Sequence, residues 1–189
     1  MHLAAWSPDD SYEQYILPVM NLNPAARQRH QIRIITVGFF RMLKCIMTNK
    51  VVRSKPEIAV LKSFLVWLEE AKAKDTGSDG VILIYHEPIK FIPFMLLEAF
   101  KRYDLLERFS EVVVALVDGH SLAEDKSDDE IKSHTLRILG KQYLNYDEND
   151  GEKNFEGNAG VRARLAYQVL EHLSKGSYAC FVTIMLREF

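Results

Sequence analysis

Cysteine is scarce in this 189-residue chain, and long hydrophobic runs are missing from it. Cys45 and Cys180 are its two cysteines, without a CxxC pair or a His/Cys group at zinc spacing, so neither a disulfide framework nor a structural metal is indicated. No stretch approaches the roughly 20 apolar residues that cross a bilayer. The opening residues, MHLAAWSPDD, also lack the features of a signal peptide. We therefore expect a reduced, intracellular protein without a metal, a cofactor or a membrane contact.

Acidic residues are missing from one long interval. Between Glu13 and Glu57 no Asp or Glu occurs, whereas eight basic residues give this stretch a local charge of +8, although the whole chain has a formal charge of −2. Acidic residues gather in segments 118–130 and 147–156 instead. A basic region attracts polyanions even in a slightly acidic protein, although an ordinary solvated face is the alternative. The candidate nucleic-acid contacts are Arg27, Arg29, His30, Arg33, Arg41, Lys44, Lys50, Arg53 and Lys55.

The first part of the chain has mainly extended character. Segments 2–6 and 12–18 flank the turn-forming SPDDS and predict a hairpin. Asn-Pro at 23–24 predicts the start of a short basic helix that ends near residue 30. The dense apolar residues of segment 32–47 have no clear period, so we expect mixed helix and loop there.

A βαβ pattern follows. Ser54 as a cap and Pro56 in the first turn predict a helix that ends near residue 74. Two apolar runs, 81–85 and 112–117, predict buried strands on either side of a helix at 91–103, and such units have a right-handed crossover. The side chains expected to point inward are Leu61, Phe64, Leu65 and Leu68 of the first helix and Phe94, Met95, Leu97 and Phe100 of the second.

Acidic loops and helices complete the pattern. We expect loops at 118–132 and 145–156, a helix at 133–143 capped by Ser133, and a last helix at 159–173. The last helix has an apolar stripe formed by Val161, Leu165, Val169 and Leu173. His134 and His172 are expected on helix surfaces. A chain of this size with 48% apolar residues builds one core, so a single α/β domain is predicted.

The segment after strand 81–85 resembles the second motif of the DEDDh 3′-5′ exonucleases. That motif runs from a strand into His-Asn and continues with Phe-Asp and an aliphatic-Pro-Phe group. Here His86-Glu87 follows the strand, and Pro93-Phe94 stands at the expected distance. The resemblance places Phe91 where the family has a metal-binding Asp.

The last helix resembles the third motif of the same family, an Ala-His with an Asp further along the helix. Segment 156–163 aligns with this motif without a gap, and the upstream run at 133–136 resembles the family's Ser-x-Ser-Leu helix start. Gly157 then takes the position of the general-base His, and Arg162 takes the position of the Asp. Arg162 is either an RNA contact or an ordinary exposed helix residue.

This resemblance implies an α/β fold with a ribonuclease-H-like mixed sheet, antiparallel strands first and parallel strands later, flanked by helices. In the family, Asp-x-Glu lies on a central strand that precedes the strand resembled by His2-Leu3-Ala4-Ala5, so we expect this first central strand to be missing here. The loss would leave unpaired backbone groups that cost about 1–3 kcal/mol each if buried. The alternative is that the apolar run from Cys180 to Leu186 fills the vacant lane.

Two-metal hydrolysis needs several carboxylates around a pair of Mg²⁺ ions, and none stands at the matching positions. A cation there opposes metal binding, since unit charges about 4 Å apart interact by about 4 kcal/mol at an effective dielectric of about 20. The resemblance therefore implies a catalytically inactive domain without a bound metal. Its degenerate active-site positions are His86, Glu87, Phe91, Gly157 and Arg162, and we expect His86 to be a hydrogen-bonded structural residue.

Longer runs resemble the insect Exuperantia family of maternal-messenger localisation factors. These runs are 13–16, 21–30, 82–87 and 105–109. The resemblance implies an exonuclease-like domain over residues 1–175 that binds maternal mRNA and forms a homodimer. Its other implied partners are ribonucleoprotein components, in cytoplasmic particles of the germline. Residues 176–189 form an apolar tail that does not resemble the family, so we expect a chain that is incomplete at both ends.

Several alternatives remain open. The chain is an RNA-binding inactive exonuclease-like domain, a working metal-dependent exonuclease whose ligands lie elsewhere, or a purely structural dimerisation module. Phe39, Phe40 and Tyr85 either stack on bases or belong to the core, and we favour the core.

Overall fold

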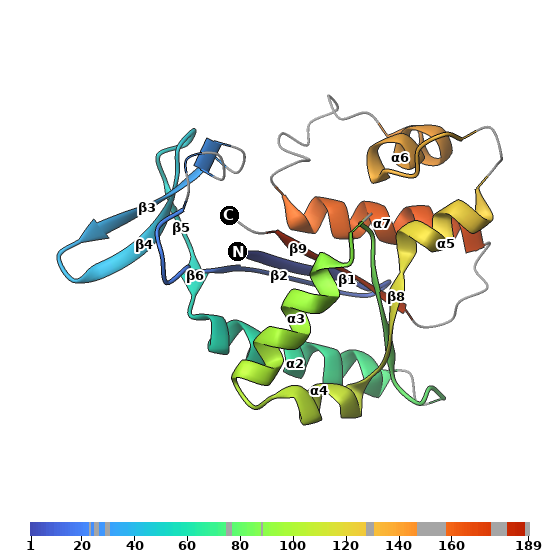
Figure 1. Ribbon diagram of the computed structural model, residues 1–189, viewed down its shortest axis with the longest axis horizontal. Helices are drawn as coiled ribbons and strands as arrows, with labels where there is room; N and C mark the ends of the chain where they lie inside the picture. Colours follow the sequence, from blue (N-terminus) through green and yellow to red (C-terminus); the bar gives the residue numbers. More distant parts are fainter. Residues whose placement is uncertain are drawn as a thin grey trace.

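The strands form two separate sheets (Figure 1). The structure, a computed structural model, describes residues 1–22, 24, 27–28, 31–74, 77–87, 89–127, 131–146, 158–174 and 181–187. The larger sheet has the strand order β6-β2-β1-β9-β7-β8, and the smaller sheet has the order β3-β4-β5. The strands are β1 (His2–Trp6), β2 (Ser11–Ile16), β3 (Ile32–Val37), β4 (Phe40–Cys45), β5 (Val51–Val52), β6 (Ser54–Lys55), β7 (Val81–Tyr85), β8 (Val113–Asp118) and β9 (Phe181–Arg187).

Helices cover both faces of the larger sheet (Figure 1). On one side lie α2 (Glu57–Lys74), α3 (Phe91–Arg102) and α4 (Leu106–Val112); on the other lie α5 (Gly119–Lys126), α6 (Leu136–Leu144) and α7 (Ala159–Ser174). β1 and β2 form the antiparallel hairpin expected from the sequence, and β7 and β8 are parallel. The mixed sheet flanked by helices confirms the predicted ribonuclease-H-like α/β fold. None of the described helices is long and apolar enough to span a membrane.

Strand β9 occupies the centre of the larger sheet. It pairs antiparallel with β1, from His2↔Arg187 to Trp6↔Thr183, and parallel with β7, from Ile82↔Phe181 to Tyr85↔Ile184. Residues 181–186 are all buried. The resemblance implied a missing strand at this position of the sheet. β9, from the other end of the chain, occupies the position, as the alternative expectation held. Cys180, the first residue of the predicted run, lies outside the described residues.

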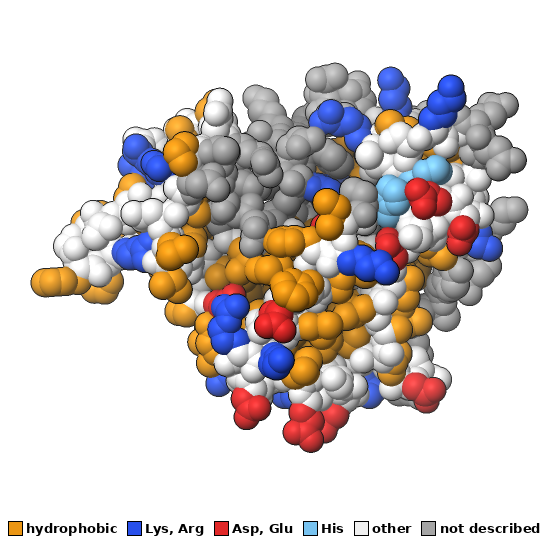
Figure 2. All heavy atoms as spheres, in the orientation of Figure 1, with side chains coloured by type: hydrophobic (Ala, Val, Ile, Leu, Met, Phe, Trp, Pro, Cys, Tyr) orange, Lys and Arg blue, Asp and Glu red, His pale blue; other side chains and the backbone are white. Residues whose placement is uncertain are grey.

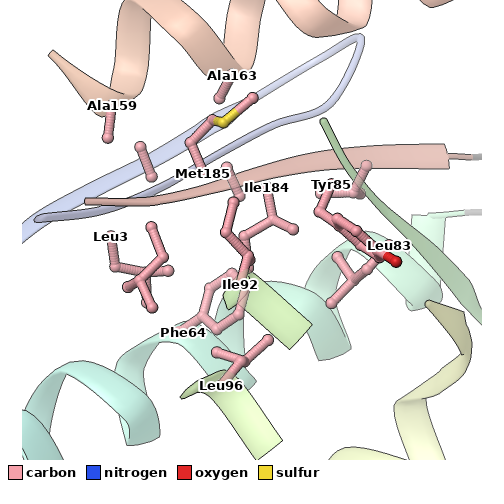
Figure 3. Packing of buried hydrophobic residues seen from close by; sticks show 14 of the residues in the cluster. Leu3, Phe64, Leu83, Tyr85, Ile92, Leu96, Ala159, Ala163, Ile184 and Met185 are labelled. Carbon is pink, nitrogen blue, oxygen red and sulfur yellow. The ribbon is translucent and has the colours of Figure 1, made fainter. Parts of the chain in front are cut away.

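The core continues on both faces of this central strand (Figure 3). On one face Met185 points toward Ala159 and Ala163 of α7, and the Thr183 hydroxyl donates to the Ala163 carbonyl oxygen over 2.6 Å. The other face packs against α2 and α3, where Phe64 is fully buried. Each fully buried large apolar side chain contributes roughly 1.5–3 kcal/mol. β9 is thus a structural part of the domain and not a loose extension.

The predicted helices mostly have the expected bounds and inward faces. All four side chains predicted to point inward from α2 are buried. On α7, Leu165 and Val169 are buried, and Val161 and Leu173 are partly buried. On α3 the prediction was partly wrong, since Phe94 is 62% exposed. The buried side chains of α3 are Ile92, Leu96, Ala99 and Phe100.

Helix starts were predicted less well. Ser54 lies in β6, which pairs parallel with β2, and α2 begins three residues later at Glu57. Helix α6 begins at Leu136, with Thr135 and not Ser133 at its N-cap position. The short basic helix expected from residue 23 to 30 lies largely outside the described residues.

Segment 32–47 is mainly a hairpin and not the expected mixture of helix and loop. β3 pairs antiparallel with β4 from Ile32↔Cys45 to Val37↔Phe40, which leaves Gly38 and Phe39 as a two-residue turn. Gly38 has φ of 59°, in the left-handed region that a two-residue hairpin turn requires. Apolar side chains on both faces of this hairpin obscured the alternation that marks a strand.

Part of the acidic loop expected at 118–132 is helix α5. The Asp118 carboxylate accepts the N–H groups of His120 (3.0 Å) and Ser121 (3.3 Å), so it caps this helix. The buried residues of α5 are the small Gly119 and Ala123. Because small residues let the helix lie close to its neighbours, no long apolar stripe is needed, and the prediction missed it. Residues 128–130, and most of the loop expected at 145–156, lie outside the described residues.

Candidate functional site

The positions aligned with the exonuclease motifs meet at the carboxyl ends of β7 and β8. His86 and Glu87 follow β7, Asp118 ends β8, and Arg162 lies near the start of α7. The charges of Arg162 and Asp118 act on the pKa values of both His86 and Glu87, so the four side chains share one site. Gly157, the position aligned with the general base, lies outside the described residues.

His86 is buried and neutral in this site. Its side chain is 2% exposed, and Nε2 donates to the His134 carbonyl oxygen over 2.8 Å. Burial lowers the pKa of His86 to about 4; the carbonyl partner acts in the opposite direction, and the positive charges nearby lower it further. The imidazole therefore links the end of β7 to the segment before α6, which is the hydrogen-bonded role expected from the sequence.

The Glu87 carboxylate closes the amino end of α3. It accepts the backbone N–H groups of Ile92 and Phe91, while Lys90 at the N-cap position makes no side-chain cap. A negative charge at this end of a helix is favoured by the helix dipole. Burial raises the pKa of Glu87, whereas the two N–H groups and Arg162 lower it. Sequence reasoning treated Glu87 only as a degenerate position and missed this capping role.

The oxygen donors of the site do not suit a pair of Mg²⁺ ions. Phe91, partly buried at the start of α3, offers no oxygen, and the carboxylates of Glu87 and Asp118 are engaged as helix caps. The central strand β9 has the sequence FVTIMLR, which contains no carboxylate. Among the described residues, no group of three or more His, Cys, Asp or Glu side chains is arranged to hold a metal ion.

A histidine cluster, formed by His86, His120 and His134, lies beside these positions. The ring centroids of His86 and His120 are 5.5 Å apart, and those of His120 and His134 are 6.1 Å apart. Glu124 Oε1 is 3.6 Å from His120 Nδ1 and 3.9 Å from His134 Nδ1. Figure 2 shows pale blue histidine side chains beside red acidic ones on this face of the molecule. The i,i+4 spacing of His120 and Glu124 was the signal that could have indicated part of this cluster.

The two histidines expected on helix surfaces have different environments. His134 precedes α6, is partly buried, and forms a hydrogen bond of 2.7 Å between its Nε2 and the Ser127 hydroxyl. His172 is exposed on α7, as predicted.

Most of the acid-free interval folds around the smaller sheet, which projects from the body of the domain (Figure 1). Arg33 of β3 lies directly opposite Lys44 of β4. Because side chains alternate along a strand, both point to one face of the hairpin, whereas Ile32 and Leu43 point to the other. Ile32 and Leu43 are buried with Leu22, so the face of Arg33 and Lys44 is turned away from this packing. We call it the open face.

No carboxylate among the described residues pairs with Arg33 or Lys44. Like charges directly opposite each other destabilise a pair of strands. The open face therefore carries a concentrated positive charge that no described carboxylate neutralises.

Other basic candidates have structural contacts. Arg27 Nε donates to the Leu22 carbonyl oxygen over 3.1 Å, and Arg41 donates to the Val19 carbonyl oxygen and, over 3.4 Å, to Asn21 Oδ1. These two guanidinium groups hold the segment that leads from β2 toward the smaller sheet. The remaining candidates, Lys50, Arg53 and Lys55, are exposed between β4 and α2, and Arg29 and His30 lie outside the described residues.

The aromatic candidates separate into two groups. Phe39 is 102% exposed and Phe40 is 73% exposed at the end of the hairpin, so the expectation that they belong to the core was wrong. The expectation was confirmed for Tyr85, which is 4% exposed. Figure 2 shows that apolar side chains end the projecting hairpin, with basic side chains behind them.

Comparison with known proteins agrees with the fold. The Exuperantia RNAse H-like domain family matches residues 1–143. Maternal protein exuperantia of Drosophila virilis is 44% identical over 200 residues, covering 92% of this chain and 41% of that protein. The protein of the same name from Drosophila melanogaster is 42% identical over 225 residues, covering 92% of this chain and 42% of that protein. The chain thus spans about two fifths of the length of these relatives, and it belongs to the Exuperantia family.

Proposed function

We propose that this chain is a catalytically inactive ribonuclease-H-like domain that binds RNA through the open face of the smaller sheet. The observation that carries the proposal is the pairing of Arg33 with Lys44 on that face. A phosphate group between two opposed cations relieves their repulsion and forms charge-assisted hydrogen bonds with both. The exposed Lys50, Arg53 and Lys55 extend the positive charge along the same part of the chain.

The proposal that the domain does not cut RNA is supported by the residues at the former active site. Carboxylates would have to hold the metal ions that activate water and stabilise the leaving oxygen. Phe91 and Arg162 occupy two aligned ligand positions, and β9 brings no carboxylate into the central lane. The charge of Arg162, which lowers the pKa values of His86 and Glu87, also opposes a divalent cation at this place.

The biological role belongs to the same proposal. Relatives that are 42–44% identical are named maternal proteins. We infer that this domain contributes to the localisation of maternal mRNA, as a homodimer within cytoplasmic ribonucleoprotein particles of the germline. Light scattering tests the homodimer, because the mass in solution should be twice the 21.8 kDa of one chain. A mass of a single chain at all concentrations would contradict it.

Salt dependence of RNA binding tests the proposed interface. Each neutralised phosphate of a single strand contributes about −0.7 to the slope of log affinity against log salt. If Arg33, Lys44, Lys50, Arg53 and Lys55 each contact a phosphate, a slope of about −3.5 is expected. The double variant Arg33→Ala/Lys44→Ala should bind more weakly and lower the magnitude of the slope by about 1.4. Fluorescence anisotropy with a labelled single-stranded RNA measures both.

The control for this variant is Lys62→Ala/Lys101→Ala, which removes the same charge from exposed positions on α2 and α3. It should bind RNA nearly as well as the original chain. Equal losses in the two double variants would show that overall charge and not the open face determines binding. Salt-independent binding, or no binding at low salt, would contradict the RNA proposal and favour a structural dimerisation module.

A further inference from the structure

The open face of the smaller sheet has two chemically different ends. Its cross-strand pairs are Arg33 with Lys44, then Ile35 with Met42, and finally Val37 with Phe40. Val37 is 58% exposed and Phe40 is 73% exposed, so the apolar end is open to solvent, as is Arg33 at the cationic end, where Lys44 is partly exposed. A continuous row of cations followed by apolar side chains distinguishes this face from the singly scattered apolar residues found on most surfaces.

The turn adds an aromatic ring to the apolar end. Gly38 and Phe39 join the two strands, and the positive φ of Gly38 allows the chain to reverse in two residues. Phe39 then has no contact that buries it, with an exposure of 102%. Two adjacent phenyl rings therefore stand at the end of a hairpin that projects from the domain (Figure 1).

The spacing of the two ends suits a nucleic acid strand. From Arg33 to Val37 the strand advances four residues, or about 13 Å at about 3.3 Å per residue. Stacked nucleotides in one strand rise about 3.4 Å each, so about four of them cover this distance. A strand that places phosphates at Arg33 and Lys44 can therefore bring bases to Phe39 and Phe40.

We infer that Phe39 and Phe40 stack on unpaired bases, which makes single-stranded RNA, and not duplex RNA, the preferred ligand of this domain. The inference rests on the proposed RNA-binding function. Aromatic side chains gain affinity from the flat faces of bases, and those faces are covered by neighbouring base pairs in a duplex. The unneutralised cations on the same face favour a polyanion over an apolar protein segment as the occupant.

The test compares two probes and matched aromatic variants of the full chain. The probes are a labelled single strand of about 12 nucleotides, within the site sizes of stacking surfaces, and the blunt duplex that it forms with its complement. Phe39→Ala/Phe40→Ala should weaken binding of the single strand by roughly 10- to 100-fold and leave duplex binding unchanged. Phe39→Tyr/Phe40→Tyr, which keeps both rings, should bind like the original chain.

Phe94→Ala is the control, because Phe94 is an exposed aromatic residue on α3, away from the hairpin. It should bind both probes normally, and thermal unfolding should show that all variants fold. If the alanine double variant binds the single strand normally while the original chain shows salt-dependent RNA binding, the stacking inference fails but the proposed function stands. Equal losses for both probes would also overturn it. If the original chain binds neither probe, the proposed function itself fails.

Discussion

At the scale of single residues, two of the positions aligned with the exonuclease motifs have structural roles. His86 and Glu87 stand where the exonucleases place a His-Asn pair, yet one fixes the segment before α6 and the other caps α3. The Glu87 carboxylate binds N–H groups that α3 itself leaves without partners, and His86 binds a carbonyl oxygen in the segment before α6. Such roles give these polar residues a function that does not require a metal ion.

The buried imidazole of His86 predicts a pH dependence of stability. Its pKa is about 4 in the folded chain against an ordinary value of 6.5, so between these pH values the unfolded chain binds a proton that the folded chain does not. Stability should therefore be fully present above about pH 6.5 and fall as pH decreases toward about 4, by on the order of 3 kcal/mol.

His86→Gln tests this prediction, because glutamine can still donate to the His134 carbonyl oxygen but does not titrate. Urea unfolding at about pH 7 and about pH 4.5 gives the free energy of unfolding for both chains. The original chain should lose more stability than the variant on acidification. Equal losses of stability in the original chain and the variant would mean that other groups cause the acid sensitivity.

Sequence patterns predicted burial better in the body than at the hairpin end. Tyr85 follows apolar residues in a central strand, so its burial was predictable. Phe39 and Phe40 also belong to an apolar run, but their exposure depends on how far the hairpin extends beyond the packing of Leu22, Ile32 and Leu43. The local sequence pattern does not determine how far the hairpin extends.

At the scale of elements, the central position of β9 depends on pairing with strands far away in sequence, 99 residues for β7 and at least 177 for β1. The apolar run of β9 was visible in the sequence, but the run did not determine the position of the strand in the sheet. The central position follows from the need for hydrogen-bond partners for the backbone groups of β1 and β7, which would otherwise be unpaired in the middle of the sheet.

Ile184→Ala tests whether β9 is part of the core. Ile184 is 0% exposed in the central strand, so truncation should lower the free energy of unfolding by about 2–5 kcal/mol. The comparison is Val114→Ala in the edge strand β8, where the side chain is 53% exposed and a change below about 1 kcal/mol is expected. Chemical denaturation measures both variants. A negligible effect at Ile184 would show that this strand does not occupy the core in solution.

Two elements that the sequence analysis missed, the β3–β4 hairpin and α5, have no unambiguous period. The β3–β4 hairpin has apolar side chains on both faces, although Gly38 marked its turn. Helix α5 lies against the sheet through Gly119 and Ala123, so a hydrophobic pattern could not reveal it, although Asp118 is a typical capping residue. Local turn and cap chemistry was therefore more informative in these segments than hydrophobicity.

At the scale of the whole molecule, charge is separated between two parts of the domain. The acid-free interval from residue 14 to 56 surrounds the smaller sheet, whereas α5 and the segments after it hold acidic residues. The βαβ pattern and the resemblance together predicted the larger sheet. The separate smaller sheet and its open face could not be predicted, because they depend on which side of the hairpin packs against the body.

A single incubation tests most directly whether this domain binds RNA without cutting it. Labelled single-stranded RNA is mixed with the full chain in low salt and Mg²⁺ or Mn²⁺, and the sample is divided between a native gel and a denaturing gel. We predict a retarded band on the native gel and full-length RNA on the denaturing gel after prolonged incubation. Shortened products that depend on the metal ion and on this chain would contradict the inactive-domain account, and an unretarded band would contradict RNA binding.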